Sequence, residues 1–223
     1  MNKKVLSFDL DDTLYDEKQF VFSGYKEVSK HIAKKSEESP EVIHNLMIKI
    51  FNEEGREGIF NNILDKYGIK TKKEISQCLR IYRSHDPEIE LYKGIEEKLK
   101  IYRDESYLIT DGNRRVQQKK VRALKIENLF KKIFFTRDYG IKNEKPSIKV
   151  FKIISEIENK NLSDIIYIGD NPNKDFLNLN KFGALTIQIG NKKSNTKEEY
   201  NAKLKFKNTI KALEYLESSK ILI

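Results

Sequence analysis

Residues 5–13 read VLSFDLDDT. The apolar residues before Asp9 indicate a buried strand, and the acidic residues that follow indicate a polar loop. A strand that ends in carboxylates presents them at the carboxyl edge of its sheet, where open α/β folds bind ligands. Asp9 and Asp11 are two residues apart, so one carboxylate can attack or bind metal while the other exchanges protons. The stretch predicts a catalytic loop, although an Asp-rich turn would have the same pattern.

A second apolar stretch runs into Thr110 and continues as Asp111-Gly112-Asn113 before a helical pattern. A Thr hydroxyl and backbone N–H groups just ahead of a helix can bind a phosphate group. The same residues also fit a plain strand-to-helix turn capped by Thr110 or Asn113. Both interpretations stay open from these residues alone.

Two further motifs follow along the chain. Lys145 precedes a Pro-Ser pair, where we expect an extended residue and then the start of a helix. Residues 165–170 read IIYIGD, and a second acid, Asp175, follows as another helix begins. Two acids across such a loop can converge on a divalent cation, which prefers oxygen ligands. The simpler alternatives are a surface lysine and a Gly-Asp-Asn-Pro turn.

The four motifs together resemble those of the haloacid dehalogenase-like (HAD-like) hydrolase superfamily, from residue 3 to about residue 190. They occur in order, and each stands at the end of an apolar strand or just ahead of a helix. The resemblance implies an α/β fold with a Rossmann-like parallel sheet, helices on both faces, and a small all-helical cap domain. Within the superfamily, the chain resembles the phosphatase branch, in which the cap is inserted after the first motif.

The resemblance also implies a catalytic role for three residues. Asp9 would be the nucleophile that forms an aspartyl-phosphate. Asp11 would be the general acid that protonates the leaving group and then the general base that activates water. Lys145 would offset negative charge on the nucleophile and the phosphate.

Phosphate and metal binding are implied in the same way. The residues implied to bind the transferring phosphoryl group are Thr110, Asp111 and Gly112. The implied cofactor is Mg²⁺, and its implied ligands are Asp9, Asp11 through its backbone carbonyl, Asp170 and Asp175. The last of these would hold the metal's waters or orient Lys145.

The second acid separates the branches of the superfamily. Haloacid dehalogenases lack it and transporting ATPases carry Lys there, so Asp11 indicates phosphate chemistry. A phosphate dianion repels a carboxylate, and Mg²⁺, Lys145 and amide dipoles would offset that repulsion. The leading hypothesis is a Mg²⁺-dependent phosphatase acting on a small phosphorylated metabolite. A sugar phosphomutase is the alternative, and a catalytically idle binding module is a third.

The length and composition of the chain limit the number of domains and the class of protein. The 223 residues can hold one α/β core and a small accessory domain, and 38% hydrophobic with 35% charged residues fits a globular chain. No apolar run approaches the roughly 20 residues of a membrane span, and no signal peptide precedes the first motif. The single cysteine, Cys78, excludes an intrachain disulfide framework. We therefore expect a cytoplasmic protein without a membrane partner, either a monomer or a homodimer.

The net charge of +9 does not indicate nucleic-acid binding. Lysines are interleaved with glutamates along the chain, as on solvated helix faces, and there is no basic block or zinc spacing. We expect no nucleic-acid partner. The positive field could speed the capture of small phosphorylated anions.

Hydrophobic periodicity predicts two domains. Residues 16–92 show helical patterns only, which predicts a helical cap domain between two segments of an α/β core, 1–15 and 93–223. Strands are expected at 3–9, 106–110, 133–136, 165–168 and 184–189. Helices are expected at 94–104, 114–126, 147–158, 173–182 and 207–218, with an exposed loop at 191–198. This alternation predicts a parallel sheet covered on both faces.

Substrate specificity is expected on the inner face of the cap. Arg56 stands between glycines, and Arg83 and His85 flank a Ser before Asp-Pro. An arginine near glycines can approach an anion closely and bind it in bidentate fashion. Asn113 is a fourth candidate for substrate contact because it borders the expected phosphate site. An exposed arginine is more often an ordinary surface charge, and that alternative stays open for both.

Overall fold

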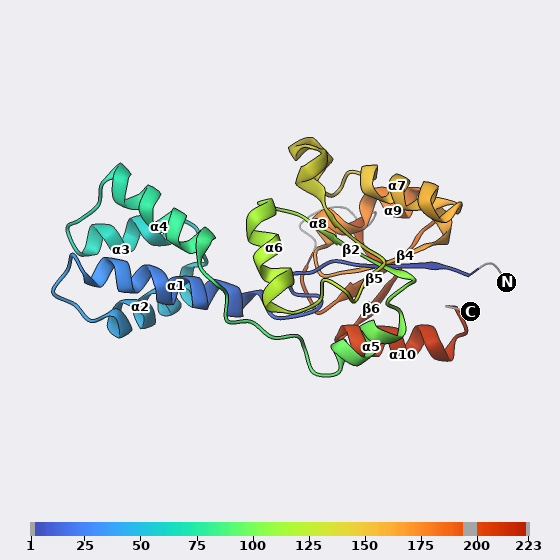
Figure 1. Ribbon diagram of the computed structural model, residues 1–223, viewed down its shortest axis with the longest axis horizontal. Coiled ribbons are helices and arrows are strands. Elements are labelled where there is room, and N and C mark those ends of the chain that lie inside the picture. The colour runs from blue at the N-terminus through green and yellow to red at the C-terminus, as the bar shows by residue number, and fades with distance from the viewer. Residues whose placement is uncertain (1–2, 194–199, 222–223) are drawn as a thin grey trace. The chain divides into compact units, whose positions relative to one another are not determined.

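The computed structural model describes residues 3–193 and 200–221 (Figure 1). It divides into two compact units. The core unit comprises Met1–Asp16 and Glu90–Ile223, and the helical unit comprises Glu17–Ile89. The predicted loop at 191–198 falls mostly outside the described residues.

The described part of the core unit contains a sheet of six parallel strands in the order β3-β2-β1-β4-β5-β6. The strands are β1 (Val5–Phe8), β2 (Ser106–Thr110), β3 (Lys132–Phe135), β4 (Ile165–Gly169), β5 (Leu185–Ile189) and β6 (Leu204–Phe206). The predicted parallel α/β sheet is confirmed. Only β6 was not expected, because three residues at a sheet edge are too few to show a pattern.

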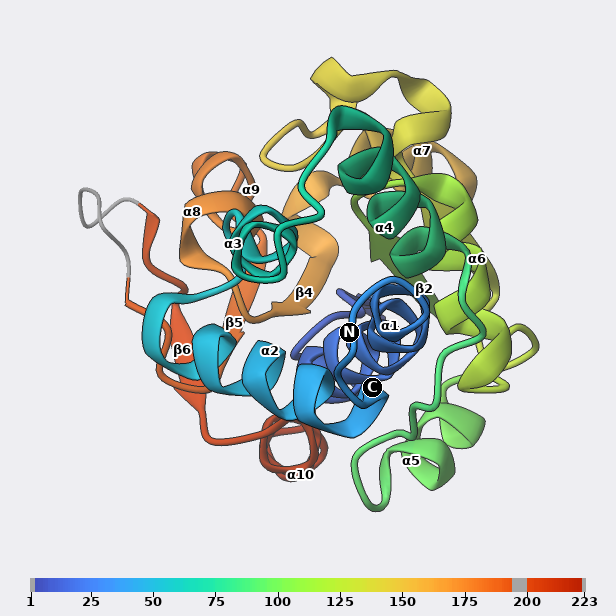
Figure 2. The same cartoon turned by 90° about the vertical axis from the view of Figure 1, so that its left-hand side faces the viewer.

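Helices cover both faces of the sheet (Figure 1). The core-unit helices are α5 (Ile95–Ile101), α6 (Arg114–Ala123), α7 (Lys149–Glu158), α8 (Pro172–Asp175), α9 (Leu177–Lys181) and α10 (Thr209–Ser218). Short 3₁₀ helices are η1 (Thr136–Tyr139), η2 (Ile141–Asn143) and η3 (Leu162–Asp164). α7 and α9 lie on one face, and α5 and α10 lie on the other (Figure 2). The helix expected at 173–182 is interrupted at Phe176, whose side chain is fully buried in the core.

The core between the sheet and α7 explains the apolar strands. Every residue of β1 and β4 is buried, as expected for central parallel strands covered on both faces. On the α7 side the sheet contributes Tyr107, Ile109 and Tyr167, which pack against Phe151 and Ile154. Burial of this kind is the main favourable term in folding.

The register of the central strands aligns their carboxyl ends. Phe8 on β1 pairs with Leu108 on β2 and with Ile168 on β4. The backbone N–H of Asp9 then donates to the Ile168 carbonyl at 2.8 Å. The chain order also reverses on the two sides of β1, which is the switch point where open α/β sheets bind ligands. Side chains that follow β1, β2 and β4 therefore reach one edge.

The helical unit consists of α1 (Glu17–Ala33), α2 (Pro40–Glu54), α3 (Ile59–Lys66) and α4 (Lys72–Ser84). The Ser39 hydroxyl caps α2 and the Thr71 hydroxyl caps α4. Apolar side chains of all four helices form a core of their own, which includes Tyr25, Ile43, Ile63 and Cys78. Among the described residues, no helix combines the length and the apolar character that a membrane crossing requires.

A buried carboxylate in the helical unit gives its stability a defined pH dependence. Glu74 accepts hydrogen bonds from Lys35 and His31, and these bonds hold the pKa of Glu74 below its usual value of 4.5. The resulting stability is present above that value and is lost as the pH falls through the lowered pKa. Glu74→Gln should reduce the unfolding temperature at about pH 7, and the deficit should shrink toward about pH 3.

Thermal unfolding followed by circular dichroism measures this difference. Glu53→Gln is the control, because Glu53 is exposed on α2. A deficit of the same size at both pH values would contradict the role given to the Glu74 carboxylate.

Candidate active site

One buried ammonium group links the ends of the central strands. Asp9 directly follows β1, and its carboxylate oxygen Oδ1 lies 2.6 Å from the Nζ of Lys145, which comes from the loop between η2 and α7. The same Nζ lies 2.8 Å from Asp175 Oδ1 on α8 and donates to the Tyr167 hydroxyl on β4 at 2.8 Å. The Lys145 side chain is only 4% exposed, so these contacts replace its hydration.

Three carboxylates gather around this ammonium group. Asp9, Asp170 and Asp175 are all buried, and each offers an oxygen within 4.8 Å of those of the other two. Asp170 directly follows β4. The second oxygen of Asp175 accepts a hydrogen bond from the backbone N–H of Asn171 at 2.8 Å. Asp175 is thus fixed by the protein on both of its oxygens, and Asp9 and Asp170 are the more accessible ligands.

The cluster carries an excess of negative charge. The pKa values of Asp9 and Asp170 are raised, because both carboxyl groups are buried and lie near other carboxylates. Burial raises the pKa of Asp9 well above its usual value, and Asp175 and Asp170 add to the rise against the opposing effect of Lys145. Burial and Asp175 raise the pKa of Asp170 to about 6, although Lys192 lies 2.9 Å away. Burial would lower the pKa of Lys145, but Asp175 and Asp9 outweigh it and hold that pKa above its usual value.

These donors fit a magnesium ion. Mg²⁺ takes oxygen ligands at about 2.0–2.1 Å in an octahedron, which places adjacent ligand oxygens about 3 Å apart and opposite ones about 4 Å apart. The three carboxylates approach that spacing, and a divalent cation would offset their excess charge. Asp9 and Asp170 would hold the ion directly. The backbone carbonyl of Asp11 remains a predicted ligand.

Asp11, the second acid of the first motif, has its own set of partners. Its Oδ1 accepts from the Tyr15 hydroxyl at 2.5 Å and from Lys120 Nζ at 2.7 Å. Its Oδ2 accepts from the Gln117 side-chain amide at 3.3 Å. Both Gln117 and Lys120 come from α6. The two acids of the first motif therefore have different surroundings, which a division into nucleophile and proton carrier requires.

The loop between β2 and α6 carries the residues expected to bind phosphate. Thr110 is buried, and its hydroxyl donates to Gln117 Oε1 at 3.0 Å. Asp111 Oδ1 accepts from the backbone N–H of Lys145 at 3.2 Å, which ties this loop to the cluster. Gly112 adopts a φ of +109°, a conformation that side chains rarely allow, and its N–H donates to Glu144 at 3.0 Å. The loop thus stands at the same sheet edge as Asp9.

Asn113 caps α6. Its side-chain oxygen accepts from the backbone N–H groups of Arg115 at 3.1 Å and Val116 at 3.3 Å. This is the capping alternative that the sequence left open for this residue. A substrate contact would have to compete with those two hydrogen bonds.

The three candidates in the helical unit differ from one another. His85 is buried, with Nε2 2.9 Å from the Ser23 hydroxyl and Nδ1 2.6 Å from the Tyr82 carbonyl oxygen. Both ring nitrogens are engaged inside this unit, so a substrate contact would have to compete with those two hydrogen bonds. Arg56 and Arg83 line one cavity of about 230 Å³, and Arg56 lies 3.3 Å from Glu17.

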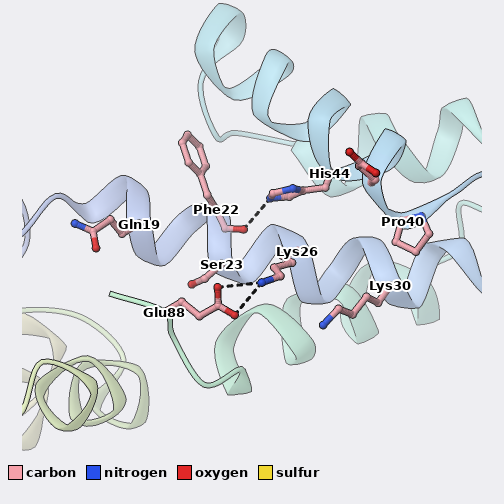
Figure 3. A pocket seen from close by; sticks show the side chains of 9 residues that line it. Gln19, Phe22, Ser23, Lys26, Lys30, Pro40, His44 and Glu88 are labelled. Atoms are coloured by element: carbon pink, nitrogen blue, oxygen red, sulfur yellow. Dashed lines mark hydrogen bonds and ion pairs between the residues drawn. The ribbon is translucent and has the colours of Figure 1, made fainter. Parts of the chain in front are cut away.

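A larger cavity of about 580 Å³ also lies in the helical unit (Figure 3). It is lined by Gln19, Phe22, Ser23, Lys26, Lys30, Pro40, Glu41, His44 and Glu88. Lys26 donates to both carboxylate oxygens of Glu88, at 2.9 and 3.0 Å, and His44 lies 3.1 Å from the Phe22 carbonyl oxygen (Figure 3). Its volume is within the range of small-molecule binding sites. The buried acids and the buried lysine lie in the core unit instead.

Four residues at the core-unit site were not predicted from the sequence: Tyr15, Gln117, Lys120 and Tyr167. One signal was available for Lys120. The apolar positions of α6 and its end are Val116, Val121 and Leu124, and Lys120 falls on the same helical face. A lysine on an apolar face needs a buried partner. Nothing in the sequence indicates that this partner is Asp11, which is 109 residues away.

The sequence and fold of this chain are similar to those of known proteins. Residues 6–189 match the family model described as haloacid dehalogenase-like hydrolase. A glyceraldehyde 3-phosphate phosphatase from Methanocaldococcus jannaschii is 25% identical, over 89% of this chain and 90% of that protein. Among solved structures, YfnB from Bacillus subtilis, described as a HAD hydrolase bound to magnesium, is 18% identical, with a TM-score of 0.62 over 97% of this chain and 100% of that chain.

A further similar structure is a protein described as a β-phosphoglucomutase from Thermotoga maritima. It is 18% identical, with a TM-score of 0.64 over 96% of this chain and 99% of that chain. At these identities the two solved structures establish a common fold. The stretch matched by the family model covers most of the chain, and the three buried acids and Lys145 lie within it.

The acidic cluster makes cation binding directly testable. Adding Mg²⁺ should raise the unfolding temperature of the core unit, because a ligand at 100 times its dissociation constant stabilises the folded state by about 2.7 kcal/mol. Asp170→Asn should remove most of that rise, since it deletes one of the two accessible carboxylates. Asp138→Asn is the control, because Asp138 is exposed and pairs with Arg114. An unchanged Mg²⁺ effect in Asp170→Asn would contradict this assignment.

Proposed function

The chain belongs to the haloacid dehalogenase-like hydrolases, and on that premise we propose that it is a Mg²⁺-dependent phosphatase of small phosphorylated metabolites. The observation that carries the proposal is the pairing of two differently placed acids after β1. Asp9 lies in a buried cluster with Lys145, whereas Asp11 lies apart with donors from α6. Hydrolysis through a covalent intermediate needs one carboxylate as nucleophile and another as proton carrier.

The first half-reaction transfers the phosphoryl group to the protein. A carboxylate oxygen of Asp9 attacks phosphorus in line with the leaving oxygen, and a P–O bond to Asp9 forms as the ester P–O bond breaks. The leaving oxygen takes the bond's electron pair and receives a proton from Asp11. The product alcohol departs, and an aspartyl-phosphate remains on Asp9.

The second half-reaction releases phosphate. Asp11, now ionised, accepts a proton from a water molecule whose oxygen attacks phosphorus. The bond between phosphorus and Asp9 breaks, its electrons return to the carboxylate, and inorganic phosphate leaves. Asp11 has regained its proton and Asp9 is free for the next turnover.

The remaining residues stabilise charge. Lys145 contacts Asp9 and offsets negative charge as the carboxylate meets the phosphate dianion. Tyr167 and Asp175 hold the ammonium group in place. The backbone amide of Asp111 would bind a transferring oxygen, and Thr110 and Gly112 would do so by exchanging the hydrogen bonds that they donate to Gln117 and Glu144. Mg²⁺, when bound, would supply a Lewis acid that neutralises charge on the phosphate.

The substrate class follows from the relatives and from the second acid. The curated relative is named for glyceraldehyde 3-phosphate, so that triose phosphate is the first compound to test. We assign the helical unit, inserted between β1 and β2, the role of a cap whose residues select the substrate. Arg56 and Arg83 are its candidate anion contacts.

Release of inorganic phosphate from a panel of phosphorylated metabolites tests the proposal. The panel includes glyceraldehyde 3-phosphate, sugar phosphates and nucleotides, each with Mg²⁺ and with a chelator. Release should depend on Mg²⁺, and Asp9→Asn should lower it by about 10³-fold or more, because the nucleophile is lost. Asp138→Asn serves again as the folded, active control.

Two results would contradict the proposal. Folded protein that releases no phosphate from any compound would exclude a broad phosphatase. Turnover that requires a bisphosphate would instead indicate a phosphomutase, which returns the phosphoryl group to a second hydroxyl.

A further inference from the structure

Helix α6 presents a buried polar pair beside the first motif. Gln117 and Lys120 are three residues apart and therefore lie on one face of the helix. Their exposed fractions are 5% and 2%, although neither residue type is usually buried. Burying an ammonium group and an amide is unfavourable unless both are well paired, so the partners of this pair decide what it does.

The partner of Lys120 at this site is Asp11. Nζ lies 2.7 Å from Asp11 Oδ1, and the Asp11 side chain keeps 22% of its surface exposed. The buried end of the ion pair is thus the lysine, and the end that can reach a substrate or a water molecule is the carboxylate.

Gln117 connects Asp11 to the phosphate loop. Its Oε1 accepts the Thr110 hydroxyl hydrogen at 3.0 Å, and its Nε2 donates to Asp11 Oδ2 at 3.3 Å. The Gln117 amide therefore connects Thr110, which is expected to bind the phosphoryl group, with Asp11, which is expected to transfer protons. Together with the Tyr15 hydroxyl on Oδ1, the carboxylate is held on both oxygens.

We propose that Lys120 and Gln117 on α6 are positioning residues that orient the Asp11 carboxylate for its proton transfers. The inference rests on the proposed function, because it assigns these residues a task in the same reaction. Asp11 must serve a leaving oxygen in one half-reaction and a water molecule in the next, and a displacement of about 1 Å can cost about 100-fold in rate. α6 begins at the phosphate loop and so places the carboxylate relative to the phosphoryl group.

The rate at which the phosphorylated protein loses its phosphoryl group measures the role of Asp11 as base separately from its role as acid. Acetyl phosphate has a good leaving group, so it can load Asp9 without a proton from Asp11. Hydrolysis of the intermediate still requires Asp11 as base. The protein is loaded from radiolabelled acetyl phosphate with Mg²⁺, and loss of protein-bound label is followed after the free reagent is removed.

Four variants complete the design: Lys120→Met, Asp11→Asn, the double variant, and Lys119→Met. Methionine keeps the length of the buried side chain without its charge. Lys119→Met removes the same charge from the adjacent position of α6. Circular dichroism and thermal unfolding establish that each variant is folded, and Gln117→Leu provides a second test of the same face.

We expect decay in Lys120→Met to slow by about 10- to 100-fold, with Lys119→Met unchanged. The double variant should decay no more slowly than Asp11→Asn, because Lys120 acts through that carboxylate. In steady state kcat should fall with little change in KM. Gln117→Leu should also slow decay without preventing loading.

Other outcomes would overturn the inference. Decay at the wild-type rate in a folded Lys120→Met, or effects of Lys120→Met and Asp11→Asn that multiply in the double variant, would show that Lys120 acts independently of Asp11. Absence of label in the folded Asp11→Asn variant, in which the intermediate cannot be hydrolysed, would refute the proposed function itself, and with it the task given to α6. The loading step and the decay step thus separate the two failures.

Discussion

The buried ammonium group of Lys145 lies 2.6 Å from Asp9 and 2.8 Å from Asp175, and this contact joins three separate parts of the core unit. One carboxylate follows β1, the other belongs to α8, and the lysine comes from the loop before α7. Loss of one partner from a buried ion pair leaves an uncompensated charge, at a cost of about 3–5 kcal/mol. Displacement of any one of these three segments would therefore leave a buried charge without its partner. Asp170 adds a further buried acid, so the site favours a cation.

Much of the fold can be predicted from the sequence, because the central strands are apolar runs that stop at Gly or Asp. β1, β2, β4 and β5 were each located within a few residues, and alternation with helices gave the parallel sheet. β6 was missed, since it has three residues and pairs with β5 alone. The break at Phe176 was also missed, because only the packed core shows that this side chain turns inward between α8 and α9.

Some residues of the candidate site could likewise be predicted from the sequence, and others could not. Asp9, Lys145 and Asp170 could be proposed from local motifs, since each directly follows or borders an element whose end the sequence indicates. The roles of Gln117 and Lys120 could not, because packing of α6 against the first loop brings them to Asp11 across more than 100 residues. The surroundings of His85 also depend on packing. Its Nδ1 contacts the Tyr82 carbonyl oxygen of α4 itself, and packing of α4 against α1 brings its Nε2 to Ser23.

The account depends on Asp9 carrying a phosphoryl group during turnover. The most direct test loads the protein with a radiolabelled phosphoryl donor in the presence of Mg²⁺, quenches it in acid, and maps the label by peptide analysis. The account predicts label on the peptide that contains residues 5–13, and none in Asp9→Asn. Label confined to another residue, or no protein-bound label even in Asp11→Asn, in which hydrolysis of the intermediate is blocked, would contradict it.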